Sequence, residues 1–556
     1  MRKRDLVRLL AICALTTISV SARTRAVRTR VTPKTPPQQV TTEPASCALT
    51  PLAPELCADG GTPANSLSAS EVTAIVSAAA RALNDNTMTV AVVDRAGRPL
   101  ALFRKPGANP ANDDLAIGVA RTAAFFSHNQ APLSSRTVRF ISGLHFPPGI
   151  TNTPSAALYG IENTNRGCDF NVTFNAGKCI PRARSLAGGT GPGIVTGKQL
   201  PNDADPSSVN AGGIPLYRVQ ASGAKVSNGQ LLGGIGVVGV PGDPQRAEYA
   251  AATGAFGSST TGIVPVPFYP LPQPGNVFID GIRLPFLGDD LRLTFNNTGL
   301  PNGVRLEGVT AGTDSGSYVV APQNGGCAAN EMLAGPRAGS RLTLNEVQGI
   351  VDRAIATARR TRAAIRLPLN RYTRMVIAVA DVDGSILALY RMPDATVFSV
   401  DVAVAKSRNV VYFSEHGVNG KVPGGTAVTN RTIAFGAQPF FPSGIDSDVF
   451  DPREGPWYQS LFVRDLNNPC SQGDQPANPN QNGIVFFAGS TPLYRGNQIV
   501  GGLGVSGDGI EQDDYVTYYG AGEFLPVQSL WADRIVIDGV RLPMFKFPRH
   551  PEGVDE

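Results

Sequence analysis

The stretch "VAVVDRAGRPLALFRKPGA" (Val90–Ala108) returns later in the 556-residue chain as "IAVADVDGSILALYRMPDA" (Ile377–Ala395). Each copy is an apolar run, a D-x-x-G turn and a second apolar run that ends in arginine, which is the pattern of a β-hairpin. Aspartate suits the first position of such a turn because it bonds its own backbone there. A repeat of this kind indicates that the chain carries one structural unit twice.

The repeat extends to both sides of the hairpin. Before it, Leu67–Leu83 matches Leu342–Ala358, and both segments have apolar residues at helical spacing. Each begins with a capping box, and the two pairs are Ser68 with Glu71 and Thr343 with Glu346. After the hairpin, Asp114–Ser127 matches Asp401–Ser414 as a second helix.

A second hairpin and a third helix complete each unit. The order helix, hairpin, helix, hairpin, helix is not a strict strand–helix alternation, so it predicts a mainly antiparallel sheet with packed helices. We therefore expect an α+β fold with two tandem domains. The expected divisions are a signal peptide at 1–22, a disordered linker at 23–66, repeat 1 at 67–300 with an insertion at 151–213, a linker at 301–341, and repeat 2 at 342–548 with an insertion at 446–483.

The first 22 residues have a basic start, a short apolar stretch and small residues before a plausible cleavage point after Ala22, so a secreted or periplasmic location is expected. No later segment is apolar for long enough to predict a membrane span. Nine of the basic residues lie within 1–34. The remainder is therefore mildly acidic, and nucleic acid is not expected as a partner.

Cysteine usage fits an exported chain. Loss of Cys13 with the signal would leave six cysteines, an even number that predicts disulfides in an oxidising compartment. They are Cys47, Cys57, Cys168, Cys179, Cys327 and Cys470. Pairing of sequence neighbours would leave Cys327 for Cys470, but the connectivity stays open. No C-x-x-C motif is present, which argues against a zinc knuckle and covalently attached haem.

Each copy contains a G-x-G-x-x-G string, "GGIGVVG" at Gly233–Gly239 and "GGLGVSG" at Gly501–Gly507. A dinucleotide site needs these glycines after a strand and before a helix, whereas here they lie along the returning strand of the second hairpin. NAD and FAD are therefore not expected. Glycines in a strand mark close approach of another backbone or of a ligand. That leaves two interpretations, a helix packed on the strand or a planar ligand or partner subunit on that face.

The ordered motifs "VAVVDRAG…LALFRKPGA…ARTAAFFS…GGIPL…GQLLGGIGVVG", found twice, resemble the GlcG/HbpS family of haem-binding, also called haem-degrading, proteins. The resemblance covers most of 67–290 and 342–546 but not the insertions. It implies two profilin- or PAS-like domains that pair with each other or form a homo-oligomer, and non-covalent binding of haem or a similar planar molecule. Haem sensing, redox sensing or haem handling would be the corresponding roles.

Haem iron is bound by His, Cys, Met or Tyr side chains. His128 and His416 both follow the second helix, one residue out of register, and are the candidate iron ligands. Arginine pairs well with carboxylates, which makes several cations candidates for the haem propionates. The candidate cofactor-binding residues are His128, His416, Arg104, Arg391, Arg121, Lys406, Arg408, Gly234, Gly236, Gly502 and Gly504.

Two other functions remain open. The chain could be an extracellular interaction or structural module that has lost its ligand, since the first helix has no histidine in either copy. It could also be a small-molecule redox enzyme. Hydrolase motifs such as G-x-S-x-G and H-E-x-x-H are missing from the sequence, so an enzyme is not indicated.

Overall fold

The computed structural model describes residues 66–144, 155–166, 196–197, 209–218, 221–222, 225–226, 230–257, 263–264, 277–279, 281–295, 297, 301–325, 332–367, 369–441, 454–467, 470–476, 480 and 482–555. The expected signal peptide (1–22) and nearly all of the expected linker (23–66) lie outside the described residues. So do all the cysteines except Cys470, and the disulfide pairing therefore stays a prediction.

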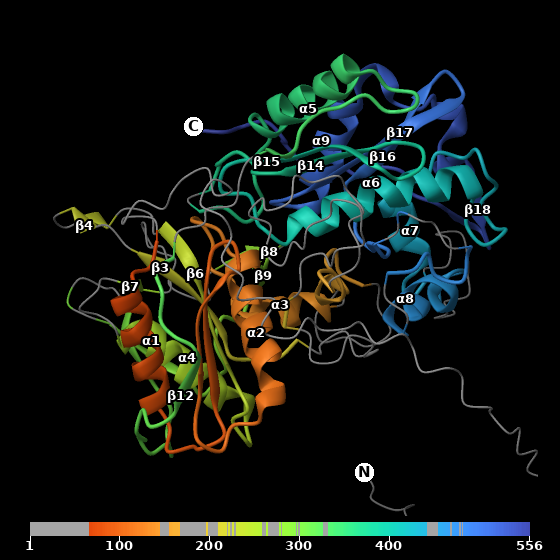
Figure 1. The fold of residues 1–556 in the computed structure, drawn as a ribbon. Coiled ribbons are helices and arrows are strands. Elements are labelled where there is room, and N and C mark those ends of the chain that lie inside the picture. The colour runs from red at the N-terminus through yellow and green to blue at the C-terminus, as the bar shows by residue number, and fades with distance from the viewer. Residues whose placement is uncertain are drawn as a thin grey trace, which may run out of the picture. The chain divides into compact units, whose positions relative to one another are not determined.

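The elements of repeat 1 follow the predicted order with one helix more than predicted, the short α3 (Figure 1). They are α1 (Ala69–Arg81), β1 (Thr89–Asp94), β2 (Pro99–Arg104), α2 (Asp113–Phe126), α3 (Ser135–Ser142), β3 (Gly213–Arg218), β6 (Gln230–Val238) and α4 (Pro244–Gly257). Short strands follow or interrupt them: β4 (Ala221–Ser222), β5 (Lys225–Val226), β7 (Ile263–Val264), β8 (Phe278–Ile279), β9 (Ile282–Arg283), β10 (Arg292–Phe295), β11 (Pro301–Arg305) and β12 (Ser317–Val320).

The elements of repeat 2 follow the same order of main helices and strands, with additional helical turns in its insertion. They are β13 (Met332–Ala334), α5 (Leu344–Ala358), β14 (Val376–Ala380), β15 (Ile386–Arg391), α6 (Ser399–His416), α7 (Asn430–Gly436), a π-helical turn (Tyr458–Val463) that continues into α8 (Arg464–Asn467), β16 (Ser490–Arg495), β17 (Gln498–Ser506), α9 (Ile510–Ala521), β18 (Val536–Ile537) and β19 (Val540–Arg541). Both predicted capping boxes are present at the starts of α1 and α5.

The two main sheets have matching strand orders. In repeat 1 the order is β12-β2-β1-β6-β3-β7, and in repeat 2 it is β13-β15-β14-β17-β16. The paired strands of both sheets run antiparallel, which confirms the predicted α+β class. The segment 301–341, expected to be a linker, contains β12 and β13, and these strands extend the first and second sheets respectively.

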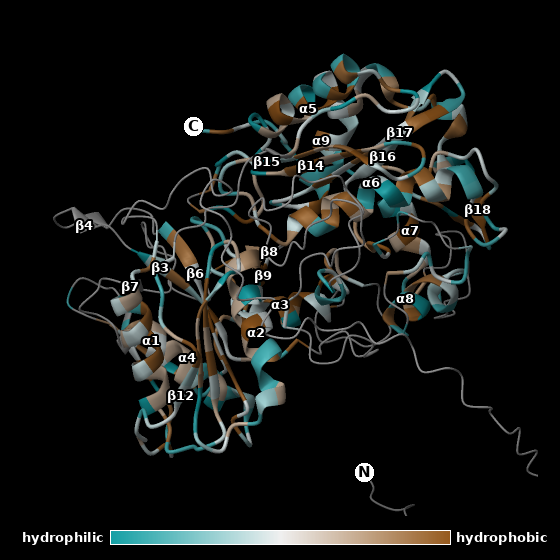
Figure 2. Ribbon diagram, in the orientation of Figure 1, coloured by the Kyte–Doolittle hydropathy of each residue, from teal (hydrophilic) through white to brown (hydrophobic). Residues whose placement is uncertain are grey.

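Each sheet is covered by helices on both faces. In repeat 1, α1 and α4 pack together, and α2 packs along β6. Alternate residues of β6 point to opposite faces, so Ile235 and Val237 join the core under α1 and α4. Repeat 2 repeats this arrangement with α5 and α9 against each other and α6 along β17. Figure 2 shows the brown, hydrophobic colour concentrated on the strands and on one side of α5.

The second helices are more deeply buried than amphipathic surface helices usually are. In α6 every residue from Ser399 to Ser414 is buried, and in α2 most residues are. Side chains of both repeats cover them, because Phe126 of α2 stacks on Phe398 with ring centroids 4.1 Å apart. None of the helices in the described ranges is both long and apolar enough to cross a membrane.

Candidate functional site

Each repeat has a pocket at the same place in its fold. One lies beside α7 in repeat 2 and has a volume of about 630 Å³, and the other lies beside α3 in repeat 1 with about 610 Å³. Three residues of the second pocket, Arg136, Phe140 and Pro285, correspond in the repeat alignment to Arg431, Phe435 and Pro543 of the first. The duplication therefore produced two pockets, not one.

The capping boxes of α3 and α7 build the frame of these pockets. Besides capping α7, Thr429 and Thr432 donate hydrogen bonds to the carbonyls of Met544 (2.8 Å) and Pro543 (2.7 Å). In repeat 1, Ser134 and Thr137 bond the carbonyls of Phe286 and Pro285 in the same way. These bonds attach the segment after the last helix to the start of the short helix, and so fix two walls of each pocket.

A buried ion pair supports each frame. Arg431 Nε donates to Asp514 Oδ2 at 2.5 Å, and Arg136 makes a two-bond contact with Glu248 at 2.6 and 2.7 Å. Burial raises the pKa of both acids, and the arginines oppose that shift. Asp514 also accepts from the backbone N–H of Lys546 at 3.0 Å. Each arginine is therefore fixed in the pocket wall by its partner.

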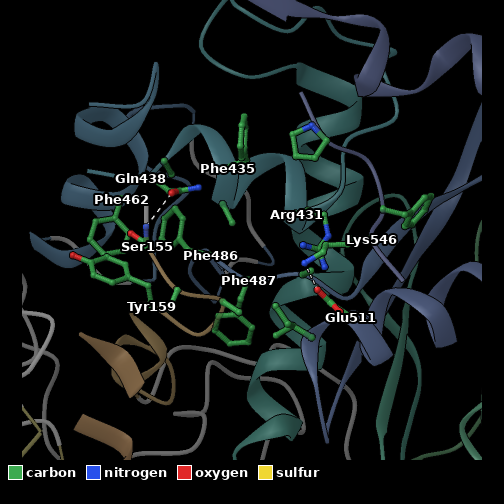
Figure 3. Close-up of a pocket in the computed structure, with 18 residues that line it drawn as sticks. Ser155, Tyr159, Arg431, Phe435, Gln438, Phe462, Phe486, Phe487, Glu511 and Lys546 are labelled. Atoms are coloured by element: carbon green, nitrogen blue, oxygen red, sulfur yellow. Dashed lines mark hydrogen bonds and ion pairs between the residues drawn. The ribbon is translucent and has the colours of Figure 1, made fainter. Parts of the chain in front are cut away.

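The repeat 2 pocket has an aromatic side and a charged side. Figure 3 shows Tyr159, Phe462 and Phe486 gathered on one side and Arg431, Lys546 and Glu511 on the other. The complete lining is Ser155, Ala156, Ala157, Tyr159, Arg431, Ala434, Phe435, Ala437, Gln438, Phe462, Phe486, Phe487, Ala488, Ile510, Glu511, Pro543, Phe545 and Lys546. Such volumes and apolar linings with a few placed polar groups are typical of small-molecule sites.

The charged side contains an ion pair that a ligand can reach. Lys546 Nζ contacts Glu511 Oε1, and the Lys546 side chain is 67% exposed. An exposed pair of this kind contributes little to stability, so an incoming carboxylate can compete with Glu511 for the ammonium group. The repeat 1 pocket is more cationic, since Arg136, Arg283 and Arg292 line it beside Asp289.

A family model described as haem degrading protein, HbpS-like, matches residues 65–254 and 342–521, which is more than half of the chain. The chain belongs to the HbpS-like family. Both matched regions coincide with the two repeats found in the sequence, so the expected family and tandem organisation are confirmed.

Two solved structures are similar to this HbpS-like chain. A complex of PduOC with heme has 20% sequence identity and a TM-score of 0.21, over 33% of this chain and 94% of that one. The Klebsiella pneumoniae protein ORFY, of the family DUF336, has 19% identity and a TM-score of 0.22, over 33% of this chain and 89% of that one. No curated protein sequence matches the chain significantly.

The structure places the two candidate histidines of this HbpS-like chain in opposite environments. His128 is fully buried; its Nδ1 accepts from the Gln130 N–H at 3.1 Å, and its Nε2 lies 3.6 Å from Asp508 Oδ1. Burial holds the pKa of His128 well below its usual value, and nearby arginines add to the effect. His416 ends α6, is exposed, stacks on Tyr412 and contacts the Tyr412 carbonyl at 3.0 Å. Neither lines the aromatic pocket.

The arginines proposed for carboxylate binding make internal contacts. Arg121 and Arg408, on α2 and α6, donate from Nε to the carbonyls of Gly97 and Gly384 at 2.8 and 2.9 Å. These glycines close the D-x-x-G turns, so each arginine attaches a helix to a hairpin. Arg391 is buried and donates to the Ala395 carbonyl, and Arg104 pairs with Asp113 on α2.

Lys406 is also fully buried. Its Nζ lies 2.9 Å from Asp513 Oδ2 and 2.8 Å from the Val505 carbonyl. The linings of the two pockets include none of the five cations proposed for the propionates, which are Arg104, Arg121, Lys406, Arg391 and Arg408. The alignment pairs Arg104 with Arg391 and Arg121 with Arg408, whereas Lys406 has no cationic counterpart in repeat 1. It did not show that most of these cations point inward.

The glycines of the two strings face a helix. A Cβ on Gly234 or Gly236 would overlap the carbonyls of Ala120 and Ala116 in α2, and one on Gly502 or Gly504 would overlap those of Ser407 and Ala403 in α6. Close packing of sheet on helix therefore accounts for these glycines, and it leaves no room for a planar ligand over them. Of the two interpretations of the glycine strings, the structure supports a helix packed on the strand.

Sequence reasoning missed the aromatic pocket because part of its aromatic side comes from insertions that do not align between the copies. Ser155 and Tyr159 belong to the insertion of repeat 1, and Phe462 to that of repeat 2. The sequence feature that could have indicated this pocket is the group of phenylalanines in "FVRD" (462–465) and "IVFFAG" (484–489), within and directly after the insertion of repeat 2. Within the described residues there is no group of three or more His, Cys, Asp or Glu suited to a metal ion.

Proposed function

We propose that this protein binds haem, or a tetrapyrrole of similar shape, non-covalently in the aromatic pocket of repeat 2. The observation that carries the proposal is a pocket of about 630 Å³ with an aromatic side and a Lys546–Glu511 side. A porphyrin has a flat apolar ring system and carboxylates along one edge. Membership of a family described as haem degrading supports the same ligand class.

The lining residues fit such a ligand. Phe435, Phe462 and Phe486 offer ring faces and edges, and Phe462 and Phe486 already pack edge-on at 4.9 Å. Lys546 would pair with a propionate. Tyr159 is the one lining residue of a type that binds haem iron, among those that the structure describes. A bound haem would bring an iron centre for redox or oxygen chemistry, and haem handling is the corresponding role.

Titration of the full-length protein with haemin tests the proposal. We expect a saturable change of the Soret band, a changed band position for Tyr159→Phe, and at least tenfold weaker binding for Phe435→Ala combined with Phe486→Ala. Tyr519→Phe is the matched control, since Tyr519 is half-exposed and does not line the pocket. His128→Asn and His416→Asn should bind haemin as the wild type does.

A flat titration would contradict the proposal and favour an interaction module that has lost its ligand. Loss of binding in the His416 variant alone would instead place the site at the end of α6. Peroxide turnover that depends on added haemin would indicate the redox-enzyme alternative.

We propose further that the protein is exported, on the basis of the basic and apolar start of the sequence. Expression of the full chain and of a chain that begins at residue 23, followed by fractionation, tests this. The full chain should reach the medium or periplasm in a shortened form, and the truncated chain should stay inside the cell.

A further inference from the structure

A smaller cavity lies behind the aromatic pocket. Its volume is about 90 Å³, and its walls come from both repeats. Most of the lining is apolar, and it comprises Phe126, Leu133, Ile141, Ala157, Leu158, Ile161, Ala364, Ile365, Phe398, Phe487, Ser506, Gly507, Gly509, Ile510, Glu511, Gln512 and Asp513. We call this the inner cavity.

The inner cavity adjoins the aromatic pocket. Four residues line both spaces: Ala157, Phe487, Ile510 and Glu511. In Figure 3 the Phe487 ring lies between the aromatic side and the charged side of the larger pocket. A small molecule, or a side arm of a larger one, would therefore reach the inner cavity past Phe487.

One side chain of the inner cavity has an unsatisfied polar atom. Asp513 is 2% exposed, and its Oδ2 accepts from Lys406 Nζ at 2.9 Å. Its Oδ1 is buried and has no hydrogen-bond partner among the residues that the structure describes. Burial raises the pKa of Asp513 to about 7, and Lys406 opposes that shift. A buried acceptor without a partner costs free energy, which a bound donor would recover.

The fold does not require this ion pair. Lys406 aligns with Val119 in repeat 1. Arg431 aligns with Arg136, and their partners Asp514 and Glu248 are therefore equivalent. The residues before these two acids, Asp513 and Ala247, align as well. Repeat 1 thus has the same fold with Val119 and Ala247 at these two positions, and both residues are apolar and buried. The charged pair is specific to the repeat that has the aromatic pocket.

We infer that the inner cavity is a binding subsite for a small neutral molecule, or side arm, that carries a hydrogen-bond donor, with Asp513 Oδ1 as the acceptor. The cavity volume limits the size of the ligand, because a dry cavity of about 150 Å³ holds benzene and the inner cavity is smaller. An alcohol of about three carbons has the required donor and an apolar body for the remaining walls. The inference does not depend on haem binding, because its test uses no tetrapyrrole.

Two isomeric probes, 2-propanol and ethyl methyl ether, test the subsite, because only the alcohol has a donor. Binding to the full-length protein is followed by NMR of the isoleucine δ1-methyl groups, one for each residue, since Ile141, Ile161, Ile365 and Ile510 line the cavity. Ile75, a buried residue of α1, serves as the unaffected reference. We expect the alcohol to shift the four methyl signals and to bind at least tenfold more tightly than the ether.

The variant Lys406→Val combined with Asp513→Ala copies the pair of repeat 1. It removes both charges together, so neither is left buried alone. It should still bind both probes, with equal affinity. Equal affinities in the wild type, or shifts absent from the four methyl signals, would overturn the inference even if the variant failed to fold. Haemin binding could fail without affecting this result, so the two proposals are tested separately.

Discussion

Asp394 of repeat 2 accepts a hydrogen bond from Arg366 Nη1 at 2.7 Å, in a buried cluster that also includes side chains of repeat 1. Arg95 donates to the same carboxylate at 2.5 Å, and the Asn129 N–H does so at 3.1 Å. Burial alone would raise the pKa of Asp394, but Arg95 and Arg366 outweigh it and hold the pKa below its usual range. One aspartate therefore connects the two repeats.

Asp394 also has a backbone φ of 64°, which favours glycine. We expect Asp394→Gly to relieve that strain and yet to cost about 2 kcal/mol or more in free energy of unfolding, because Arg95 loses its carboxylate partner and the buried Arg366 keeps only Asp508 of its two. Urea denaturation measures the change. Asp538→Gly is the control, since Asp538 has φ 51° and is exposed; it should be neutral or stabilise by up to about 1 kcal/mol. Equal effects would show that the charge cluster contributes nothing.

His128 should make the protein sensitive to acid. Its folded pKa is lowered, so below about pH 6.5 the unfolded chain binds a proton that the folded chain does not. The contribution of His128 to the free energy of unfolding is therefore complete above pH 6.5. Below that pH about 1.4 kcal/mol of it is lost for each pH unit, until the histidine of the folded state is itself protonated. The slope of unfolding free energy between pH 7 and pH 5 checks this.

In His128→Asn the amide oxygen can still accept from the Gln130 N–H, and the slope should become smaller. His416→Asn, at the exposed end of α6, should keep the wild-type slope. A wild-type slope in both variants would show that His128 is not the group that titrates.

Asp401 should have the opposite effect on pH dependence. Its carboxyl accepts from the Asn165 N–H at 3.1 Å through Oδ2, while Oδ1 has no partner within the described ranges. Burial raises the pKa of Asp401 to about 7. The folded state thus favours the protonated form, so this contribution is complete below about pH 4 and is lost as the pH rises to 7.

Asp401→Asn cannot titrate and should therefore be more stable than the wild type at pH 8, by about 2–4 kcal/mol relative to their difference at pH 4. Asp383→Asn, on the exposed hairpin turn, is the control and should show no such change. Denaturation at the two pH values decides the matter. An unchanged difference would mean that Asp401 is ionised throughout.

The glycines under α2 and α6 predict a packing effect. Gly236→Ala and Gly504→Ala place a methyl group against the helix backbone, and each should cost about 1–3 kcal/mol in unfolding free energy. Gly335→Ala is the control, because a Cβ there would meet no atom of the described part of the chain within 4 Å. Thermal unfolding of the three variants measures the difference. Unaltered stability of Gly236→Ala and Gly504→Ala would show that the helices do not pack as closely as described.

Local patterns allowed much of the fold to be predicted. These patterns depend on neighbours only a few residues away, as with the capping residues Ser68 and Thr343, the turn residues Asp94 and Gly97, and the alternation along the strands. Because each pattern occurs in both repeats, the sequence was enough to place them. The short helices α3 and α7 were missed, although Ser134 and Thr429 cap them, because threonine replaces the usual glutamate three residues later.

The candidate site could not be predicted in the same way. His128 and His416 are near-equivalents in sequence, yet one is buried beside Asp508 and the other is exposed, since burial depends on what packs against the helix end. Arg121 and Arg408 recur because they attach a helix to a hairpin turn, a role that a recurring cation does not reveal.

The sequence by itself determined the duplicated α+β unit, the starts of α1 and α5, and the family, because these follow from local periodicity and from the order of motifs. Tertiary structure decided that the glycine strands face helices and that Lys406 pairs with Asp513. It also decided that Tyr159 and Phe462, 303 positions apart by their numbers, share one pocket wall. Such contacts arise from the packing of distant segments, and the free energy of that packing depends on shape and burial in three dimensions.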